Sequence, residues 1–416
     1  MRNSRRVVIT GLGVVAPNGI GKETFWQNLV AGKSAIGYIT AFDPSPYPCH
    51  VAGEVRDFDP TAFMHVRRTK HRGRFSQFAV AAAKLALVDA NIDIGAEQRR
   101  RVVACLGNSM NGSGDVYENA RVGFDREGMK GIPLMSGIEF AAHAPVSHVS
   151  SELGIGGQGM TIASACATGL DAIQWAVDQI QKDQADVVFS GSTEAPISEF
   201  CFATLGALGA LSKFTDPPLK ASRPYDLRRD GLVLGEGAAI CVLEELEHAI
   251  DRGARIYAEV LGYGSGNEGG FGNRINAAEL ALADAITSAL SIAGKSPQDI
   301  DHINAHGNAL PDYDLIETRA FRQALGNAAY SVPTSSIKSM IGHAMGAASA
   351  FQIVAACLTL ERSVIPPTIN YETPDPECDL DYVPNEARAS RVRTVLINAH
   401  AMGGTHAVVV LGKPEP

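Results

Sequence analysis

The feature that most constrains this chain is the alternation, along its whole length, of short apolar runs rich in β-branched residues with amphipathic helical segments. The residue pattern predicts strands at 6–10, 102–107, 160–164, 186–191, 238–243, 256–262, 301–305, 331–334, 393–398 and 406–411. It predicts helices at 76–90, 168–182, 277–293 and 344–360. Strands that alternate with helices in this way indicate an α/β fold with largely buried sheets.

Two parts of the chain begin alike, with a strand that runs into glycines: RVVITGLG at 6–13 and RIYAEVLGYGSG at 255–266. In each part a later strand leads to a reactive side chain at a turn, Cys166 in the first and His306 in the second. This repetition predicts an internal duplication. We expect an N-terminal half over 1–254 and a C-terminal half over 255–416.

Charge, hydropathy and cysteine spacing exclude several classes of protein. The formal net charge of −9 disfavours nucleic acid as the main partner. No apolar run is long enough to predict a membrane span. The seven cysteines are dispersed and contain no Cys-x-x-Cys pair, which favours free thiols in a reducing cytoplasm over a disulfide framework or a zinc knuckle.

One stretch, HVRRTKHRGRF at 65–75, is basic although the net charge of the chain is negative. It includes Arg67, Arg68 and Lys70. The stretch is either a solvated surface or a local landing patch for an acidic partner.

Cys166 lies in TIASACATGLDAI at 161–173, after a β-like run and just before a predicted helix. A helix N-terminus stabilises a thiolate, and its unpaired backbone N–H groups bind an oxyanion. The neighbours Ala165 and Ala167 would let a substrate approach closely. A buried structural cysteine is the competing interpretation.

Two histidines and a lysine are candidate partners of this thiol. His306 ends an apolar strand in INAHG, while Lys338 and His343 occur in KSMIGHAMGAA at the start of a small-residue helix. The spacing of His302 and His306 is that of a zinc pair on a helix, but here the two lie on an extended run and no third ligand follows. GLGVVAPNG lacks the third glycine of a dinucleotide loop. We therefore predict neither a metal nor a nucleotide cofactor.

Taken together, these motifs resemble the β-ketoacyl-acyl carrier protein synthases, the elongating condensing enzymes of type II fatty acid and polyketide synthesis. The resemblance covers nearly the whole chain and includes VVITGLGVVAPNG, ACATGLDAI, SRPYDLRRDGLVLGEGAA, VIPPTIN and NAHAMGGTHA. It implies a thiolase-like fold of two similar halves in a five-layer α-β-α-β-α sandwich, working as a dimer.

The resemblance also implies a role for each candidate residue. Cys166 would carry the acyl group, and the backbone N–H groups of Cys166 and Met402 would form the oxyanion hole. His306 and His343 would hold the malonyl thioester during decarboxylation. Lys338 would orient this site, paired with Asp314 or Glu317. The phosphopantetheine arm would arrive on the acyl carrier protein, so no resident cofactor is expected.

Several positions depart from the pattern of the family. Asn308 and Leu310 replace hydroxyl residues that contact the phosphopantetheine arm, and His400 replaces a gate phenylalanine. Gln352 stands where relatives carry a glutamate near the lysine. The other residues expected at the gate or the acyl pocket are Met110, Leu205 and Asn398. These departures predict an active enzyme with altered substrates, in a specialised polyketide or polyene pathway or in fatty acid synthesis.

The family also suggests a function for the basic stretch and leaves alternatives open. Arg67, Arg68 and Lys70 align with the region that docks the acidic carrier protein, and Arg121 and Arg126 are weaker candidates. A malonyl decarboxylase is one alternative. A subunit that is active only as a heterodimer of a ketosynthase and a chain-length factor is another, so a homodimer and a heterodimer are both open.

Overall fold

The two parts of the chain contribute strands in the same order and with the same directions. In the first part the order across the sheet is β1-β8-β7-β5-β6, and in the second it is β9-β15-β14-β10-β11. In each series the first three strands pair antiparallel and the last two pairings are parallel. This match supports the predicted internal duplication.

The computed structural model describes residues 5–414 except 96, 98 and 270–274. The strands of the large sheet are β1 Val7–Ala16, β2 Gly19–Ile20, β5 Val102–Gly107, β6 Gly159–Ile162, β7 Val187–Glu194, β8 Gly237–Glu245, β9 Ala258–Asn267, β10 His302–Asn304, β11 Thr334–Ser335, β14 Thr394–His400 and β15 Thr405–Gly412. Two small sheets pair β3 Gly37–Tyr38 with β4 Val51–Ala52, and β12 Val364–Ile365 with β13 Arg388–Ala389.

The helices are α1 Lys22–Val30, α2 Val66–Thr69, α3 Arg74–Ala90, α4 Asp115–Glu127, α5 Ser136–Glu139, α6 Ala144–Leu153, α7 Thr168–Gln181, α8 Glu199–Ala207, α9 Leu246–Asp251, α10 Ile275–Ala293, α11 Pro311–Leu325, α12 Lys338–Ile341 and α13 Ala348–Arg362. None of the described helices combines the length and the hydropathy that a bilayer span requires.

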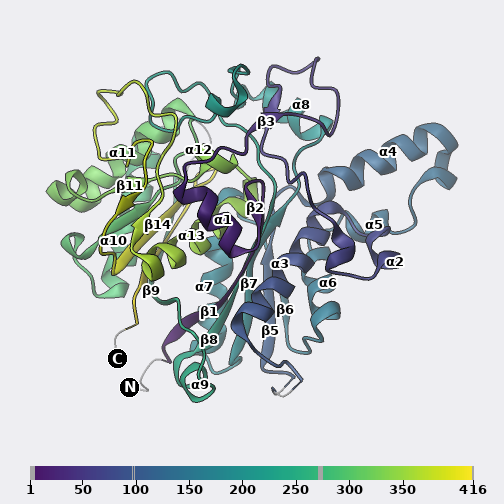
Figure 1. The fold of residues 1–416 in the computed structure, drawn as a ribbon, viewed down its shortest axis with the longest axis horizontal. Coiled ribbons are helices and arrows are strands. Elements are labelled where there is room, and N and C mark those ends of the chain that lie inside the picture. The colour runs from purple at the N-terminus through teal and green to yellow at the C-terminus, as the bar shows by residue number, and fades with distance from the viewer. Residues whose placement is uncertain (1–4, 96, 98, 270–274, 415–416) are drawn as a thin grey trace.

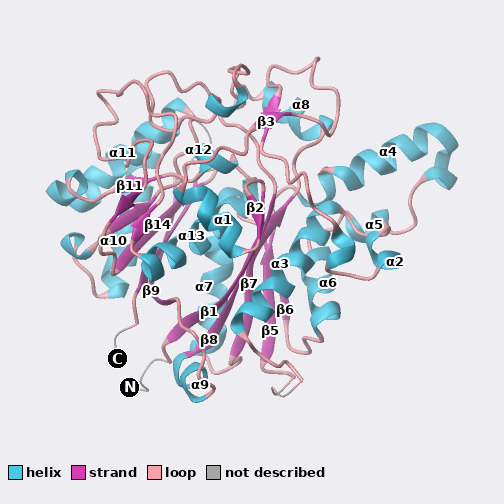
Figure 2. Ribbon diagram, in the orientation of Figure 1, coloured by secondary structure: helices cyan, strands magenta, loops and turns pink. Residues whose placement is uncertain are grey.

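Three hydrophobic cores fill the spaces between the layers (Figures 1 and 2). One core joins α3 and α6 to the outer face of the first set of strands. A second joins α10 and α11 to the outer face of the other set. The largest core surrounds α7 and α13, which lie between the two sets of strands. The predicted five-layer thiolase-like arrangement is therefore confirmed, with one addition: β1 and β9 pair along Val8–Ile9, so hydrogen bonds link both sets into one sheet.

Glycines explain why both halves begin in the same way. A Cβ atom on Gly13 of β1 would lie 1.9 Å from the Ala82 carbonyl oxygen of α3, and one on Gly264 of β9 would lie 2.0 Å from the Ala285 carbonyl oxygen of α10. Only a residue without a side chain lets helix and strand backbones approach this closely. The glycines that reveal the duplication in the sequence are therefore required for helix–strand packing.

Two predicted boundaries shift for local reasons. The predicted strand at 331–334 overlaps β11 only at Thr334, because the Val332 N–H bonds back to the Ala328 carbonyl and closes a turn. The helix predicted to begin at residue 344 begins at Ala348, because Met345–Ala347 forms a 3-10 turn first.

The close approach of α7 and α13 gives a stability prediction. A Cβ on Gly169 would lie 2.4 Å from the Ala350 backbone nitrogen and 2.8 Å from Ser349 Oγ. We expect Gly169→Ala to destabilise the protein by ~1–3 kcal/mol, the usual effect of overpacking a core. Thermal unfolding measures this, with Gly137→Ala as the control, since no described atom outside its local backbone lies within 4 Å of a Cβ there. Equal midpoints for the two variants would contradict the packing argument.

Candidate active site

Cys166 lies in a tight turn between β6 and α7. The turn is the 3-10 segment Ala165–Ala167, and Ala165 has a φ of 50°, in the left-handed region. The Thr168 hydroxyl accepts the Ser164 N–H and donates to the Ala165 carbonyl, which closes the start of α7. The thiol is thus held directly before the helix, as the sequence predicts.

The electrostatics of the thiol differ from the expectation. Burial raises the pKa of Cys166 to about 11, while Lys338 and the backbone N–H groups of Met402 and Cys166 oppose the rise. Desolvation of the anion therefore outweighs the helix terminus. This pKa favours the protonated thiol at neutral pH, and the two N–H groups that oppose the rise are those expected to form an oxyanion hole.

His306 and His343 converge on Cys166 from the second half of the chain. One ring nitrogen of each histidine and the sulfur all lie within 4.8 Å of one another. The two rings are 5.3 Å apart between centroids and nearly perpendicular, at 77°. All three side chains are buried. The structure therefore brings together the three residues that the sequence singles out for chemistry.

Hydrogen bonds assign the tautomer of each imidazole. His343 Nδ1 accepts the Met345 N–H, so His343 Nε2 carries the hydrogen. His306 Nε2 faces the Asn308 amide nitrogen at 3.2 Å, and Asn308 Oδ1 accepts the Leu310 N–H, which fixes the amide orientation. His306 Nδ1 therefore carries the other hydrogen. His306 Nδ1 and His343 Nε2 are buried without a hydrogen-bond partner among the residues that the structure describes.

Burial keeps both imidazoles neutral. Desolvation, reinforced by Lys338, lowers the pKa of His343 to about 3 and that of His306 well below its usual value. Two neutral rings with free N–H groups are suited to donate hydrogen bonds to an oxygen that becomes negative.

Lys338 has other partners than those expected. Its Nζ donates to the His306 carbonyl at 2.6 Å and to Gln352 Oε1 at 3.1 Å. It forms no ion pair with Asp314 or Glu317 among the described contacts, so the predicted pairing is wrong. Burial lowers the pKa of Lys338 to about 8, and the charges of Glu317, Cys166 and Asp314 counteract this at longer range.

Asp314 and Glu317 instead hold the loop that follows β10. Glu317 accepts the N–H groups of His306 and Gly307 at 2.7 and 2.9 Å, and Asp314 accepts those of Asn308 and Ala309 at 3.0 and 3.2 Å. The two carboxylates of α11 therefore fix the backbone that carries His306.

Gln352 of α13 ties the lysine to this loop and to β14. Its amide nitrogen lies within 3.1 Å of three backbone carbonyls, those of Asn304, Ala305 and Asn398. Its amide oxygen accepts from Lys338. A glutamate could not donate to these carbonyls, which gives a structural reason for the amide that departs from the family.

Three of the residues predicted for the gate and acyl pocket share one apolar cluster with Met402. Leu205 of α8 packs in it with buried Phe202 and Met345, and the partly buried members include Met110, Leu310 and Met402. This cluster adjoins the start of α13, where Met345 follows His343 closely. The Met345–Ala347 turn contacts the Ala165–Ala167 turn, so the cluster borders the segment that carries the thiol.

The three polar gate candidates lie elsewhere. Asn308 turns inward to His306, as described above. Asn398 donates to Glu317 Oε1, so it supports the carboxylate that holds the His306 loop. His400 stacks on Tyr313 at 4.1 Å between ring centroids and lies 6.3 Å from the His306 ring. The sequence analysis did not identify Tyr313 as a site residue. Its position one turn after Leu310, on the adjoining helix, was the signal that could have identified it.

The predicted docking residues lie on the surface at α2. Arg67, Arg68 and Lys70 are exposed. Arg68 is paired with Glu152, whereas no described ion pair involves Arg67 or Lys70. Arg121 is surrounded by Glu118, Asp125 and Glu199, and Arg126 pairs with Glu127, so these two offer little free positive charge.

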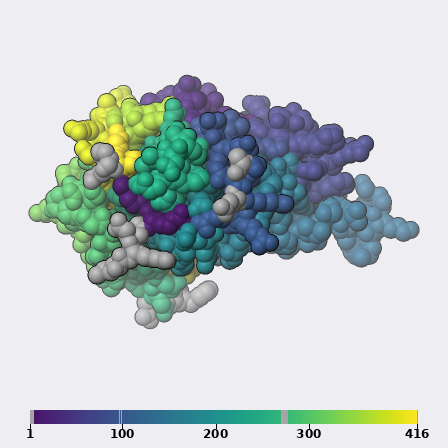
Figure 3. Space-filling view, turned by 90° about the horizontal axis from the view of Figure 1, so that it is seen from below, coloured from purple at the N-terminus to yellow at the C-terminus, as the bar shows by residue number. Residues whose placement is uncertain are grey.

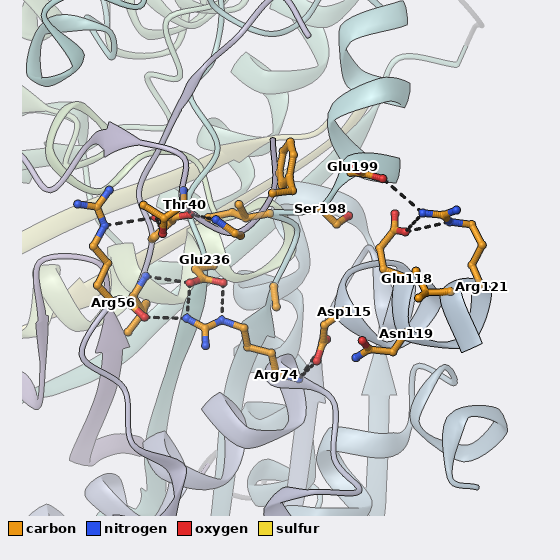
Figure 4. A pocket seen from close by; sticks show the side chains of 17 residues that line it. Thr40, Arg56, Arg74, Asp115, Glu118, Asn119, Arg121, Ser198, Glu199 and Glu236 are labelled. Carbon is orange, nitrogen blue, oxygen red and sulfur yellow. Dashed lines mark hydrogen bonds and ion pairs between the residues drawn. The ribbon is translucent and has the colours of Figure 1, made fainter. Parts of the chain in front are cut away.

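A separate cavity of about 660 Å³ is lined by Arg121, Glu118 and Glu199 among others, but not by Cys166, His306, His343 or Lys338 (Figure 4). Its wall includes the ion pair of Arg74 and Glu236, and the Asp115 carboxylate accepts the Arg74 backbone N–H (Figure 4). We assign it no part in the chemistry of Cys166.

The tautomer assignment gives a mutational prediction. In Asn308→Asp the new carboxylate would accept from His306 Nε2, so the hydrogen would move there and His306 Nδ1 would lose its donor. We expect decarboxylation of a malonyl thioester to fall about 100-fold, the usual loss of one donor to an oxyanion, while acylation of Cys166 persists. Asn308→Ala, which imposes no tautomer, should lose less. The same loss in both variants would contradict the assignment, which ¹⁵N shifts of the His306 ring test directly.

Comparison with known proteins agrees with this geometry. The model of the β-ketoacyl synthase N-terminal domain matches residues 4–249, and that of the C-terminal domain matches 257–372. The chain is 42% identical over 423 residues to a putative polyketide β-ketoacyl synthase 1 of Streptomyces cyaneus, covering 99% of both chains. It is 40% identical over 413 residues to 3-oxoacyl-(acyl-carrier-protein) synthase 2 of Coxiella burnetii, covering 98% of this chain and 99% of the other.

Solved structures of ketosynthases are also similar to this chain. The ishigamide ketosynthase/chain length factor superposes with a TM-score of 0.92 at 35% identity, covering 99% of this chain and 100% of the other. A type II polyketide synthase acyl-carrier protein in complex with its ketosynthase, bound to the hexaketide, matches with a TM-score of 0.90 at 34% identity and the same coverage. With its Cys-His-His constellation on a duplicated thiolase-like fold, the chain belongs to the β-ketoacyl synthase family.

Proposed function

We propose that the protein catalyses the decarboxylative Claisen condensation of an acyl group on Cys166 with malonyl-acyl carrier protein, giving 3-oxoacyl-acyl carrier protein and carbon dioxide. The observation that carries this proposal is the convergence of one buried thiol with two neutral imidazoles, each with a free N–H. The family membership supports the reaction class.

In the first half-reaction Cys166 attacks the thioester of an acyl carrier protein. The backbone N–H groups of Cys166 and Met402 stabilise the negative oxygen that develops on the thioester carbonyl. The proton of the Cys166 thiol ends on the departing phosphopantetheine thiol. The acyl group then occupies the apolar cluster around Leu205 and Met110.

In the second half-reaction a malonyl thioester occupies the space beside the two histidines. His306 Nδ1–H and His343 Nε2–H donate to its thioester carbonyl, so that loss of carbon dioxide leaves an enolate whose charge they stabilise. The enolate carbon attacks the acyl carbonyl and Cys166 leaves as a thiolate. Lys338 acts as a positioning residue, because it holds the His306 carbonyl and contributes a positive charge.

The side chains that line the site suggest the class of substrate. An apolar cluster with a polar gate residue, His400, favours a specialised unsaturated or oxygenated chain of polyketide or polyene type over an ordinary saturated one. Some curated relatives are named as ketoacyl synthases of polyketide formation, and others are named 3-oxoacyl-(acyl-carrier-protein) synthase 2. Retention of Cys166 disfavours the alternative of a simple malonyl decarboxylase.

A dimer is the proposed working form. The β6 strand forms the edge of the sheet, and α4 and the segments after it form a lobe that projects from the body (Figures 1 and 3). This lobe exposes large apolar side chains, including Met129 at 79% and Leu134 at 89%. Apolar patches of this kind mark protein interfaces. The partner is a second copy or a chain-length factor, as in the ishigamide complex.

The remaining predictions fit this picture. Each half supplies a different part of the site: residues 1–254 supply Cys166, and residues 255–416 supply the two histidines and Lys338. The chemistry calls for no resident cofactor, since the phosphopantetheine arm belongs to the carrier substrate. All seven cysteines are free and buried, which supports the proposal of a reducing compartment.

The basic patch gives a test of carrier docking. Because Arg67 and Lys70 are exposed and Arg68 is held by Glu152, we expect the double variant Arg67→Glu, Lys70→Glu to weaken transfer from acyl carrier protein about 10-fold or more by charge repulsion. Turnover of a small acyl thioester should be unchanged. Steady-state rates with both substrates measure this, and Arg126→Glu is the control. An equal loss with both substrates would contradict docking at α2.

The proposed function is tested by product analysis. The protein, with a partner subunit where one is required, is incubated with malonyl-acyl carrier protein and a panel of saturated, unsaturated and oxygenated acyl carriers. We expect 3-oxoacyl products two carbons longer, formed faster from the unsaturated or oxygenated substrates. Carbon dioxide without chain extension would instead support a decarboxylase, and a preference for saturated medium-length chains would contradict the specialised role.

A further inference from the structure

At the gate, two side chains from neighbouring strands and a third from the segment after β9 converge on one point. His400 at the end of β14 and His406 near the start of β15 are directly paired across the strands. Glu268 follows β9, the neighbouring strand of β15. One ligand atom of each of these three residues lies within 4.8 Å of the other two. We call this group the gate triad.

The distances within the gate triad suit a shared ion better than direct hydrogen bonds. Glu268 Oε1 lies 3.3 Å from His406 Nε2 and 3.7 Å from His400 Nε2. Ligand atoms that bind one tetrahedral zinc at their usual bond lengths are about 3.3–3.4 Å apart. A charged hydrogen bond between an imidazolium and a carboxylate would be about 2.7–2.9 Å long.

Apart from their approach to Glu268, the imidazoles of the triad have few partners. His406 is fully buried, and neither of its ring nitrogens has a hydrogen-bond partner among the described residues. His400 Nδ1 is buried and unpartnered as well. A ring nitrogen that has no hydrogen-bond partner is available to bind a metal. Unpaired buried polar atoms call for an unassigned ligand.

We propose that Glu268, His400 and His406 form a binding site for a divalent transition metal, with Zn²⁺ the preferred ion. Two imidazoles and one carboxylate are a frequent ligand set for zinc, and they leave a fourth position open. Glu268 supplies a negative charge against the ion, and the stacked Tyr313 ring fixes the plane of His400. The proposed condensation does not require this metal.

The place of the site suggests what the metal would do. His400 precedes Met402 by two residues, and the Met402 N–H points toward the Cys166 sulfur. An ion bound by the gate triad would fasten the β14–β15 turn to the segment after β9. It would thereby hold the gate segment that borders the active site in one position.

The test must separate this site from the catalytic one, because Cys166, His306 and His343 also lie close enough to share a metal. We would measure Zn²⁺ and Co²⁺ binding to chelator-treated protein by equilibrium dialysis, calorimetry and visible absorption. The variants are Glu268→Gln, which is nearly isosteric and partly exposed, His406→Asn, and Cys166→Ala. Thermal unfolding without metal shows whether each variant folds.

We expect the wild type and Cys166→Ala each to bind one ion per chain. The midpoint of thermal unfolding should rise when the metal is bound. The spectrum of the cobalt-loaded protein should lack a thiolate charge-transfer band. Glu268→Gln should weaken binding by at least about 10-fold, and His406→Asn should act likewise. Absence of binding, binding lost in Cys166→Ala, or binding unchanged in the folded Glu268→Gln variant would each overturn the proposal. Condensation by the metal-free protein, measured in parallel, distinguishes this failure from failure of the proposed function.

Discussion

Replacing Cys166 with alanine should lower chain extension by ~10⁴-fold or more, because the covalent route disappears with the nucleophile. Decarboxylation of malonyl-acyl carrier protein should persist, since His306, His343 and Lys338 remain in place. The two activities are measured together, as 3-oxoacyl product and as released carbon dioxide.

A second buried cysteine provides the matched control for this experiment. Cys378 is fully buried in the core on the outer face of the second set of strands, outside the catalytic cluster. Cys378→Ala should therefore leave chain extension unchanged apart from any loss of stability. Chain extension that survives in Cys166→Ala would remove the nucleophile from the mechanism.

Replacing His343 with alanine should have the opposite selectivity. We expect malonyl decarboxylation, and with it chain extension, to fall about 10²–10³-fold, the effect of deleting one preorganised donor to an oxyanion. Acylation of Cys166 should continue, because the N–H groups of Cys166 and Met402 are untouched. Rapid-quench measurement of the acyl-enzyme and of carbon dioxide separates the two steps.

The control for His343 is a histidine with similar burial and no contact with the site. His302 on β10 is also fully buried, burial lowers its pKa to about 3, and its Nε2 lies 3.1 Å from Ser335 Oγ. His302→Asn is expected to lower stability without changing the ratio of the two steps. Loss of acylation in His343→Ala would mean that this histidine serves the first half-reaction instead.

The sequence predicted much of the fold because its signals are local. Each predicted strand overlaps a strand of the structure, since a β-branched run identifies a buried strand without knowledge of its neighbours. The duplication was visible because glycines in β1 and β9 allow the same close packing, against α3 and α10 respectively. The boundary near β11 was missed because a turn hydrogen bond to Ala328 decides it.

The site was predicted less evenly. Cys166 and His306 follow from motifs after strands and His343 from a motif before a helix, and the topology then brings the three together. The implied pairing of Lys338 with a carboxylate was wrong, because Asp314 and Glu317 accept backbone N–H groups of the His306 loop instead. The high pKa of Cys166 depends on complete burial, which no local pattern reveals. Glu268 stands in a glycine-rich stretch, and only the pairing of β9 with β15 places it beside two histidines.

Intact-mass analysis of the protein after exposure to an acyl carrier substrate tests the central claim most directly. We expect a mass increase equal to one acyl group per chain, located by peptide mapping on Cys166, and loss of that mass when malonyl-acyl carrier protein is added and the 3-oxoacyl product appears. An acyl group on any other residue, or no acylation by any carrier substrate of a folded and correctly partnered protein, would contradict the account.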